Sequence, residues 1–393
     1  METARKVLTG LDTELEWIHE TYRELHQYPE LSLQETRTGA LVAGKLEEFG
    51  YQVQRLGGTG VVGVLGNGPG RTVLARADMD GLPVREATGL DYSSQNDGVM
   101  HACGHDVHVA ALLGAAKLMA DHRGEWSGTY ITLFQPAEET AQGSAAMVAD
   151  GLAAKIPAPD VAFAQHVMQL PAGELQTVTG PVLSAGDSIR ITVHGAGSHG
   201  STPHLSVDPV VLAASIVMRL QAVVSREVAP GQFAVLTIGS LQVGTKSNII
   251  ADRATLLLNL RTYDNAVRNT LIDAVERIVR GECAAAGSPK EPEFEYYDQF
   301  PLTTNDHAVT ARVSQAFEKY FGQVGAASRQ SASEDFSRIP DALGIPYTFW
   351  LLGGGTTVGN HSPLFAPVLE PTLSRGVQAM VLAALSELSV NSL

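Results

Sequence analysis

The sequence is poor in cysteine and in positive charge. Cys103 and Cys283 are the two cysteines among 393 residues, too few for a framework of disulfides. The chain has 27 basic residues against 42 acidic ones, so its formal net charge is −15, which repels phosphate backbones and anionic lipid. We therefore expect no nucleic-acid partner and no binding to a membrane surface.

Long hydrophobic runs are absent as well. No run of about 18 uninterrupted apolar residues occurs, although 44% of the residues are hydrophobic, so we expect no segment that spans a membrane. Residues 1–20 are typical of a charged helix and lack the apolar centre and small-residue cleavage site of a secretory signal. The expected location is the cytoplasm.

Two patterns of helices and strands follow one another along the chain. Up to about residue 180, predicted helices alternate with apolar strands, which favours a mostly parallel sheet. Between 187 and 301 the expected order is β-α-β-β-α-β, the split βαβ arrangement of ferredoxin-like domains. A helix, a strand and a helix then resume the first pattern. The prediction is an α/β protein whose catalytic domain, 1–186 and 302–393, carries an inserted domain at 187–301.

The segment MHACGHDVH, residues 100–108, concentrates side chains that bind metals. Thiolate and imidazole both bind zinc well, and a nearby cation would explain a lone thiol because it favours the thiolate. If the segment is extended, Cys103 and His105 point to the same side, while Gly104 lets the backbone approach an ion closely. The alternative is a buried free cysteine beside histidines that share no role.

Three further segments offer ligands after predicted apolar strands. Glu138 and Glu139 follow one such strand, and His166 and His361 each follow another. Loops after parallel strands gather at one edge of a sheet, where open α/β folds place their sites. A solvated acidic turn and separate structural histidines are the alternatives. We expect instead a single metal centre whose ligands are Cys103, His105, Glu139, His166 and His361.

Five ligands are more than one tetrahedral zinc ion needs. If one residue and one water each bridge, about eight bonds are available, four for each of two ions. Two ions roughly 3.5–4 Å apart polarise a carbonyl and bring the pKa of a shared water towards neutrality. Glu138, the carboxylate left over, is the expected general base for that water and later the acid for the leaving nitrogen.

At these residues the chain resembles the co-catalytic metallo-amidohydrolases that include aminoacylase, hippurate hydrolase and the indole-acetyl-amino-acid hydrolases. The resemblance is strongest to bacterial aminoacylases and implies hydrolysis of the amide bond of N-acyl amino acids, giving a carboxylic acid and a free amino acid. It runs nearly end to end, through HQYPELSLQE, RADMDGLPV, MHACGHDVH, QPAEE, FAQHV, GSHGSTPH, SNIIADR, LRTYD, SEDFS and GNHSP.

The resemblance also implies roles that spacing alone does not give. It makes the inserted domain a lid and dimerisation domain, and it makes His199 a residue that reaches the partner subunit's active site and stabilises the oxyanion. Asn248 and Arg261 match positions that contact substrate, and the fork of an arginine suits a substrate carboxylate. Asp80 and Asp106 match carboxylates that orient metal ligands.

Simpler interpretations of these residues stay open, and the sequence departs from the family pattern twice. His199 would otherwise be a turn residue in a glycine-rich loop, Arg261 a partner in a surface ion pair, and the two aspartates ordinary loop carboxylates. Asn248-Ile-Ile-Ala-Asp has alanine where the family has proline. Asp78-Met79-Asp80 replaces the His-x-Asp of many relatives, which makes Cys103 more important for the metal centre.

Three functions are weighed from the sequence. The favoured one is a homodimeric, metal-dependent amidohydrolase of N-acyl amino acids with a small-molecule substrate. The second is a dipeptidase or carboxypeptidase that uses the same metal pair. The third is a metal-binding or scaffold protein without catalysis, against which Glu138 argues because storage needs no unligated base. Of the two divalent ions considered, zinc suits the thiolate, and manganese is the alternative.

Overall fold

The computed structural model describes residues 2–390 and divides into two compact units. The first unit comprises Met1–Val182, Thr303–Arg329 and Asp335–Leu393, and the second comprises Leu183–Leu302 and Gln330–Glu334. The short return of the chain at Gln330–Glu334 lies outside the insertion predicted at 187–301. This segment supplies backbone and hydroxyl oxygens that accept hydrogen bonds in the second unit. No local sequence pattern predicts this contribution.

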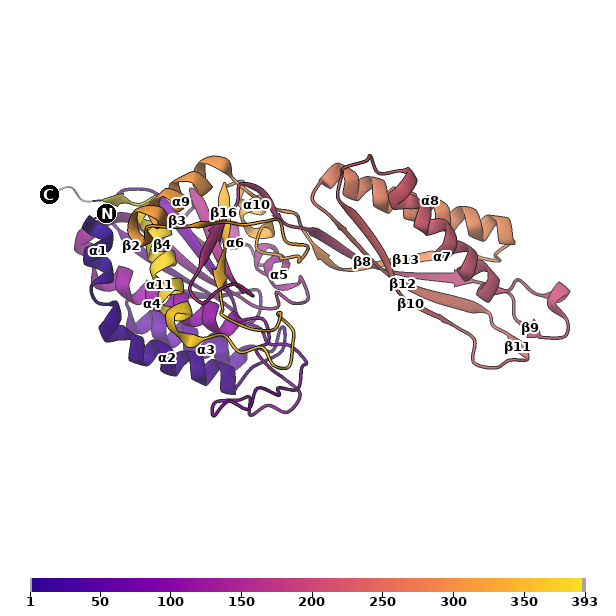
Figure 1. Ribbon diagram of the computed structural model, residues 1–393, viewed down its shortest axis with the longest axis horizontal. Helices are drawn as coiled ribbons and strands as arrows, with labels where there is room; N and C mark the ends of the chain where they lie inside the picture. The colour runs from indigo at the N-terminus through magenta and orange to yellow at the C-terminus, as the bar shows by residue number, and fades with distance from the viewer. Residues whose placement is uncertain (1, 391–393) are drawn as a thin grey trace. The chain divides into compact units, whose positions relative to one another are not determined.

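A nine-stranded sheet forms the frame of the first unit (Figure 1). Its strands, in spatial order, are β1 (Gln52–Leu56), β2 (Gly60–Asn67), β4 (Trp126–Gln135), β3 (Thr72–Asp78), β5 (Val161–Met168), β16 (Tyr347–Gly353), β6 (Leu175–Thr177) and β15 (Gly325–Ala326), and β17 (Ser389–Val390) pairs with β4. The central strands β4, β3, β5 and β16 are parallel, whereas β1 and β2 form an antiparallel edge. The expected mostly parallel sheet is confirmed.

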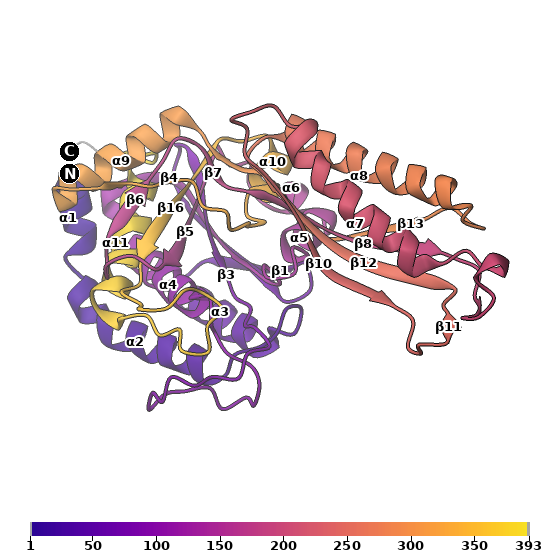
Figure 2. The ribbon, with the colours of Figure 1, turned by 45° about the vertical axis from the view of Figure 1, so that its right-hand side comes forward.

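Helices of the first unit pack against this sheet and against one another (Figure 2). They are α1 (Glu2–Leu8), α2 (Leu11–Gln27), α3 (Thr36–Glu48), α4 (His105–Asp121), α5 (Gly143–Ala149), α6 (Leu152–Lys155), α9 (His307–Phe321), α10 (Arg338–Leu343) and α11 (Leu369–Leu385). Helix α4 packs on β3 and β5 and is in turn covered by α2, α3 and α11.

Helix α4 is the central helix of the core. Of its 17 residues, 14 are buried, as is typical of a helix that is apolar on every side. Its first turn carries His105, Asp106 and His108, all of them buried. A helix that is buried over its whole length holds the side chains at its start in fixed positions. This explains why predicted metal ligands are concentrated at the start of an apolar helix.

The second unit is a four-stranded antiparallel sheet covered by two helices that lie side by side. In spatial order the strands are β10 (Ala234–Val243), β12 (Arg253–Thr262), β8 (Ala185–His194) and β13 (Glu293–Phe300), and the helices are α7 (Pro209–Arg226) and α8 (Asn265–Ala286). A two-stranded sheet in this unit pairs β9 (Ser198–His199) with β11 (Ile249–Ile250). Strands β7 (Gly180–Leu183) and β14 (Thr303–Asn305), which pair with each other, lie almost entirely within the first unit.

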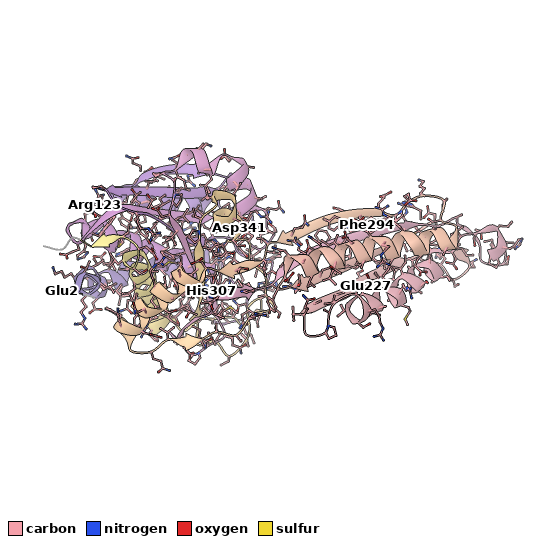
Figure 3. All side chains as sticks on the ribbon, turned by 90° about the horizontal axis from the view of Figure 1, so that it is seen from above. Glu2, Arg123, Glu227, Phe294, His307 and Asp341 are labelled. Carbon is pink, nitrogen blue, oxygen red and sulfur yellow. The ribbon has the colours of Figure 1, made fainter. Side chains whose placement is uncertain are left out.

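Helix α7 has one buried and one exposed apolar face. Leu212, Ile216 and Leu220 are buried in the core of the second unit, while Val211 and Met218 are 67% and 73% exposed. Within residues 2–390, α7 is the one helix long and apolar enough in composition to cross a membrane. Core helices pass the same test. Figure 3 shows Phe294 on β13 of the same unit, together with Glu227 at the end of α7.

Candidate metal centre

The carboxyl ends of the parallel strands bring the predicted ligands together. Glu139 follows β4, His166 lies near the end of β5 and His361 follows β16. Cys103 Sγ lies 3.5 Å from His166 Nε2, and His361 Nε2 lies 3.3 Å from Glu139 Oε2. His105 Nε2 is 3.9 Å from Glu139 Oε1. Four segments that are distant in sequence therefore meet at one place within the first unit.

We call Cys103, His105, Glu139, His166 and His361 the ligand cluster. Its potential ligand atoms form two groups of three, and Cys103 belongs to both. Within each group, all the ligand atoms lie within 4.8 Å of one another. The first group adds His105 and His166, and the second adds Glu139 and His361. Two groups that share one residue fit two neighbouring cations, one at each group.

The segment Cys103-Gly104-His105 is not extended, so the predicted reason for the side-by-side placement of Cys103 and His105 is wrong. His105 is the first residue of α4, and Gly104 has a left-handed backbone with φ of 88°. A Cβ atom at Gly104 would lie 2.9 Å from the Cβ of Val167. The glycine thus allows a sharp turn and a close approach to β5, and this turn, rather than strand alternation, sets Cys103 beside His105.

Two buried atoms of the cluster have no hydrogen-bond partner, and both are of a kind that binds metals. They are His105 Nε2 and Glu139 Oε1. Buried polar atoms are nearly always paired, so these two fit a site for a cation. His105 Nδ1 donates to the carbonyl oxygen of Asp80 at 2.9 Å, which leaves the Nε2 lone pair directed at the cluster. The residues present therefore fit a metal centre.

The electrostatics of the cluster favour positive charge. Burial raises the pKa of the Cys103 thiol, but His105 and His361 outweigh it and lower that pKa to about 7. Burial, together with the nearby Cys103, raises the pKa of Glu139 to about 7. Hydrogen bonds to Cys103 and Glu139 raise the pKa of His361 to about 10. Glu139 and His361 therefore hold protons more tightly than usual, and a divalent cation can replace those protons.

Asp80 contacts both a predicted ligand and the turn that follows β4. Its Oδ1 lies 3.2 Å from His105 Nδ1, and its two oxygens accept the N–H groups of Glu138 and Glu139 at 3.1 and 3.0 Å. Burial opposes the charge of Asp80, but the His105 hydrogen bond and others lower its pKa. An orienting carboxylate needs such contacts.

Asp106 has a different neighbourhood. Its Oδ2 lies 2.7 Å from His26 Nδ1, and its Oδ1 accepts the N–H of Val107. Burial disfavours a charged His26, but hydrogen bonds to Asp106 and Glu86 outweigh burial and raise the pKa of His26 to about 9. Asp106 thus fixes the start of α4 next to His105 through its contact with α2.

Sequence reasoning missed two supporting side chains. His108 Nε2 accepts the N–H of Val167 at 2.8 Å, next to His166, and its Nδ1 donates to Asp78 at 2.5 Å. Asn360 donates to the carbonyl oxygens of Cys103 and Val167 at 3.2 and 3.0 Å. The only sequence signal for either is adjacency, because His108 ends MHACGHDVH and Asn360 directly precedes His361.

The residues with predicted oxyanion and substrate roles belong to the second unit. His199 is exposed on β9, and its Nδ1 accepts the N–H of Ser201 at 3.2 Å. Asn248 is exposed just before β11. Arg261 on β12 donates to Asn259 Oδ1 at 3.0 Å and to oxygens of Ser331 and Ser333. Burial lowers the pKa of Arg261. These contacts of Arg261 are to neutral oxygens rather than to a carboxylate.

Comparisons with known proteins identify the family. The model of peptidase family M20/M25/M40 matches residues 74–386. Thermostable carboxypeptidase 1 of Saccharolobus solfataricus is 36% identical over 395 residues, 98% of each chain. An N-acyl-L-amino acid amidohydrolase of Geobacillus stearothermophilus is 39% identical over 282 residues, 70% of this chain and 74% of that protein.

A solved structure agrees with these matches. A dinuclear metal-binding peptidase of the M20 family from Bacillus subtilis has a TM-score of 0.80 and 30% sequence identity, over 95% of this chain and 98% of that one. The resemblance drawn from the motifs is therefore confirmed, and with it the expectation of a hydrolase. The chain belongs to peptidase family M20/M25/M40.

Proposed function

We propose that the protein hydrolyses the amide bond of N-acyl amino acids and releases a carboxylic acid and a free amino acid. The observation that carries this proposal is the ligand cluster with Glu138 beside it. Glu138 is 4% exposed, and its Oε2 lies 3.9 Å from His105 Nε2. The burial of this carboxylate beside the five proposed ligands supports its role as the general base.

The chemistry divides between the metal pair and the chain. The ligand cluster would hold two divalent ions, zinc in our proposal with manganese as the alternative, and these ions would polarise the amide carbonyl and make a water molecule more acidic. Glu138 takes a proton from that water as the oxygen–carbon bond forms. The same carboxyl group then gives the proton to the leaving nitrogen as the carbon–nitrogen bond breaks. The chain itself contributes no nucleophile.

His199 is proposed to stabilise the oxyanion in the active site of a partner subunit. Its Nδ1 accepts the backbone N–H of Ser201, so a neutral His199 ring carries its proton on Nε2. An exposed Nε2–H is the donor that a developing oxyanion requires. The side chain is solvent-exposed, which supports a role towards something outside its own unit.

A homodimer formed through the second unit completes this proposal. The strand order β10-β12-β8-β13 supports a ferredoxin-like lid and dimerisation domain spanning 187–301. Strand β10 is an edge strand, and α7 exposes Val211 and Met218. Open strand edges and exposed apolar faces are commonly covered by a partner, and a second copy is the simplest one. The proposed location is the cytoplasm.

Arg261 and Asn248 are the proposed contacts to the carboxylate of the amino acid product. The neutral oxygens around Arg261 hold the guanidinium in place without neutralising its charge. Its Nη2 group, which takes no part in these three hydrogen bonds, can donate to a substrate carboxylate. Free α-carboxylates occur in N-acyl amino acids and at peptide C-termini alike, so this contact alone does not separate the two substrate classes.

A carboxypeptidase or dipeptidase is the second candidate. Its support is the similarity to thermostable carboxypeptidases 1 and 2, each 36% identical over 98% of this chain. The metal chemistry would be the same, and only the group on the acyl side of the scissile bond would differ. The residues that surround the acyl group of the substrate therefore decide between the two functions.

A paired assay tests the proposal. The kcat/KM values for N-acetyl, N-benzoyl and longer N-acyl amino acids are measured beside those for dipeptides with the same C-terminal residue. The metal content of the protein is measured in the same preparation. We expect the N-acyl amino acids to be preferred, with the E138Q variant as the background control. A large preference for dipeptides would overturn the proposal in favour of the second candidate.

A further inference from the structure

The turn that presents Glu138 contains backbone strain. Ala137, which directly precedes Glu138, has a φ of 47°, and Ala141 has a φ of 54°. Residues with a Cβ atom seldom adopt this left-handed region, and they keep it only where their surroundings enforce it. Within the turn, the carbonyl oxygen of Ala137 accepts the N–H groups of Gln142 and Gly143 at 3.2 and 3.1 Å, and further stabilising groups come from distant parts of the chain.

Two buried carboxylates accept three consecutive N–H groups of this turn. The N–H of Ala137 donates to Glu35 Oε1 at 2.8 Å. The N–H groups of Glu138 and Glu139 donate to the two oxygens of Asp80. Glu35 and Asp80 are 0% and 1% exposed. Buried acceptors that are themselves fixed in place can hold a strained backbone through such hydrogen bonds.

Glu35 is itself held at both oxygens. Its Oε1 also accepts the N–H of Leu33 at 3.0 Å, and its Oε2 accepts the hydroxyl of Thr59 at 2.6 Å. It is the last residue of HQYPELSLQE, a motif to which the hydrolysis reaction assigns no role. The carboxylate therefore reaches Ala137 from a rigid position 102 residues away in sequence.

The geometry points to Glu35 as a positioning residue for the general base. It holds Ala137 in the left-handed conformation and thereby sets the direction of Glu138. Asp80 performs a different task, because it contacts His105 as well as the turn. The contacts of Glu35 described above include no member of the ligand cluster. This inference rests on the proposed role of Glu138 as the base.

Two conservative variants distinguish the effect of the length of the Glu35 side chain from the effect of its charge. Glu35→Gln keeps the length of the side chain and its Oε1 acceptor, and its amide can still pair with the Thr59 hydroxyl. Glu35→Asp keeps the charge but shortens the side chain by one methylene, which withdraws the acceptor from Ala137. A misplacement of about 1 Å can cost on the order of 10²-fold in rate.

We expect E35D to lower kcat by roughly 10- to 100-fold with KM and bound metal unchanged, and E35Q to retain most of the turnover. The matched control is Glu47→Asp, the same shortening at an exposed glutamate of α3, which should leave kcat unchanged. E35D activity equal to wild type, or E35Q impaired more than E35D, would overturn the inference. So would a loss of kcat that merely follows a loss of metal.

Amide hydrogen exchange of residues 137–139 gives a readout independent of activity. The three amides should be protected in the wild type, in E35Q and in E47D, and the Ala137 amide should exchange faster in E35D. Unchanged exchange in E35D would refute the positioning role. A wild type inactive on every N-acyl amino acid would instead refute the proposed function, and the exchange data would still decide the role of Glu35.

Discussion

His105 of the ligand cluster in the first unit and His199 in the second unit differ in how firmly their side chains are held. His105 is fully buried, and its Nδ1 is fixed by Asp80. His199 is exposed, and its partners are the hydroxyl and backbone N–H of Ser201, two residues away. The difference shows that His105 is fixed by contacts within the first unit, whereas the side chain of His199 is open to solvent.

Buried charges beneath the cluster reinforce this difference. Arg76 is 1% exposed and donates to Asp78 at 2.6 Å and to Gln135 at 3.0 Å. Asp335 accepts from Gln135 at 2.5 Å and from the Ser144 hydroxyl at 2.6 Å. Breaking one member of a buried ionic network typically costs about 3–5 kcal/mol. Buried, paired charges thus stabilise the part of the first unit that carries the ligand cluster.

The largest expected effect is that of Glu138→Gln. This variant keeps the shape of the side chain but cannot take a proton, so kcat should fall by about 10²- to 10⁴-fold. Bound metal should not change, because Glu138 is outside the ligand set. Steady-state kinetics and metal analysis of one preparation test both statements, and retained turnover would end the assignment of Glu138 as the base.

The next largest effect is expected at His199, the exposed residue of the comparison. His199→Ala should lower kcat by roughly 10²- to 10³-fold, the usual loss for one oxyanion donor, with metal content unchanged. If His199 acts in the partner's active site, mixing inactive H199A and E138Q chains should restore activity, since a mixed dimer contains one complete site. Mixtures that stay inactive although the chains exchange would contradict action across the dimer.

A smaller effect distinguishes two buried aspartates. Asp80→Asn should weaken metal binding by about 10- to 100-fold, because Asp80 orients His105. Asp106→Asn is the matched control, since Asp106 pairs with His26 instead, and its effect on metal affinity should be clearly smaller. Competition with a chelator measures both affinities. Equal losses would show that direct contact with a ligand is not what matters.

The smallest effect is on the pH dependence of stability. The pKa of His26 is about 9 in the folded protein and about 6.5 in an unfolded chain. Its ion pair therefore stabilises the fold fully below about pH 6.5, and this contribution is lost as the pH rises through about 9. Urea unfolding at several pH values should show the loss in wild type and in H204Q, and a flatter profile in H26Q. Identical profiles would remove His26 from this role.

Local patterns in the sequence predict the frame of the site well. The apolar runs of β3, β4, β5 and β16 and the apolar helix α4 are evident because each is buried on all sides. The meeting of the ligands follows from that frame, since parallel strands end at one edge. The cluster was therefore predictable from strand order without any knowledge of side-chain contacts.

Contacts between distant segments were not predictable in the same way. Glu35 and Ala137 are 102 residues apart, and Asn360 and Cys103 are 257 apart, so no local pattern relates the members of either pair. The conformation of residues 103–105 was missed for a related reason. The left-handed turn at Gly104 is set by packing against Val167, a residue on another strand.

The most direct test of the central claim is a metal titration of the chelated protein. Metal is removed from the purified protein, zinc is added back in steps, and hydrolysis of an N-acyl amino acid is followed with bound metal per chain. We predict that chelation abolishes activity and that activity returns as two ions bind per chain. Full activity after complete removal of metal, or with binding that saturates below two ions, would contradict the two-metal site formed by the ligand cluster.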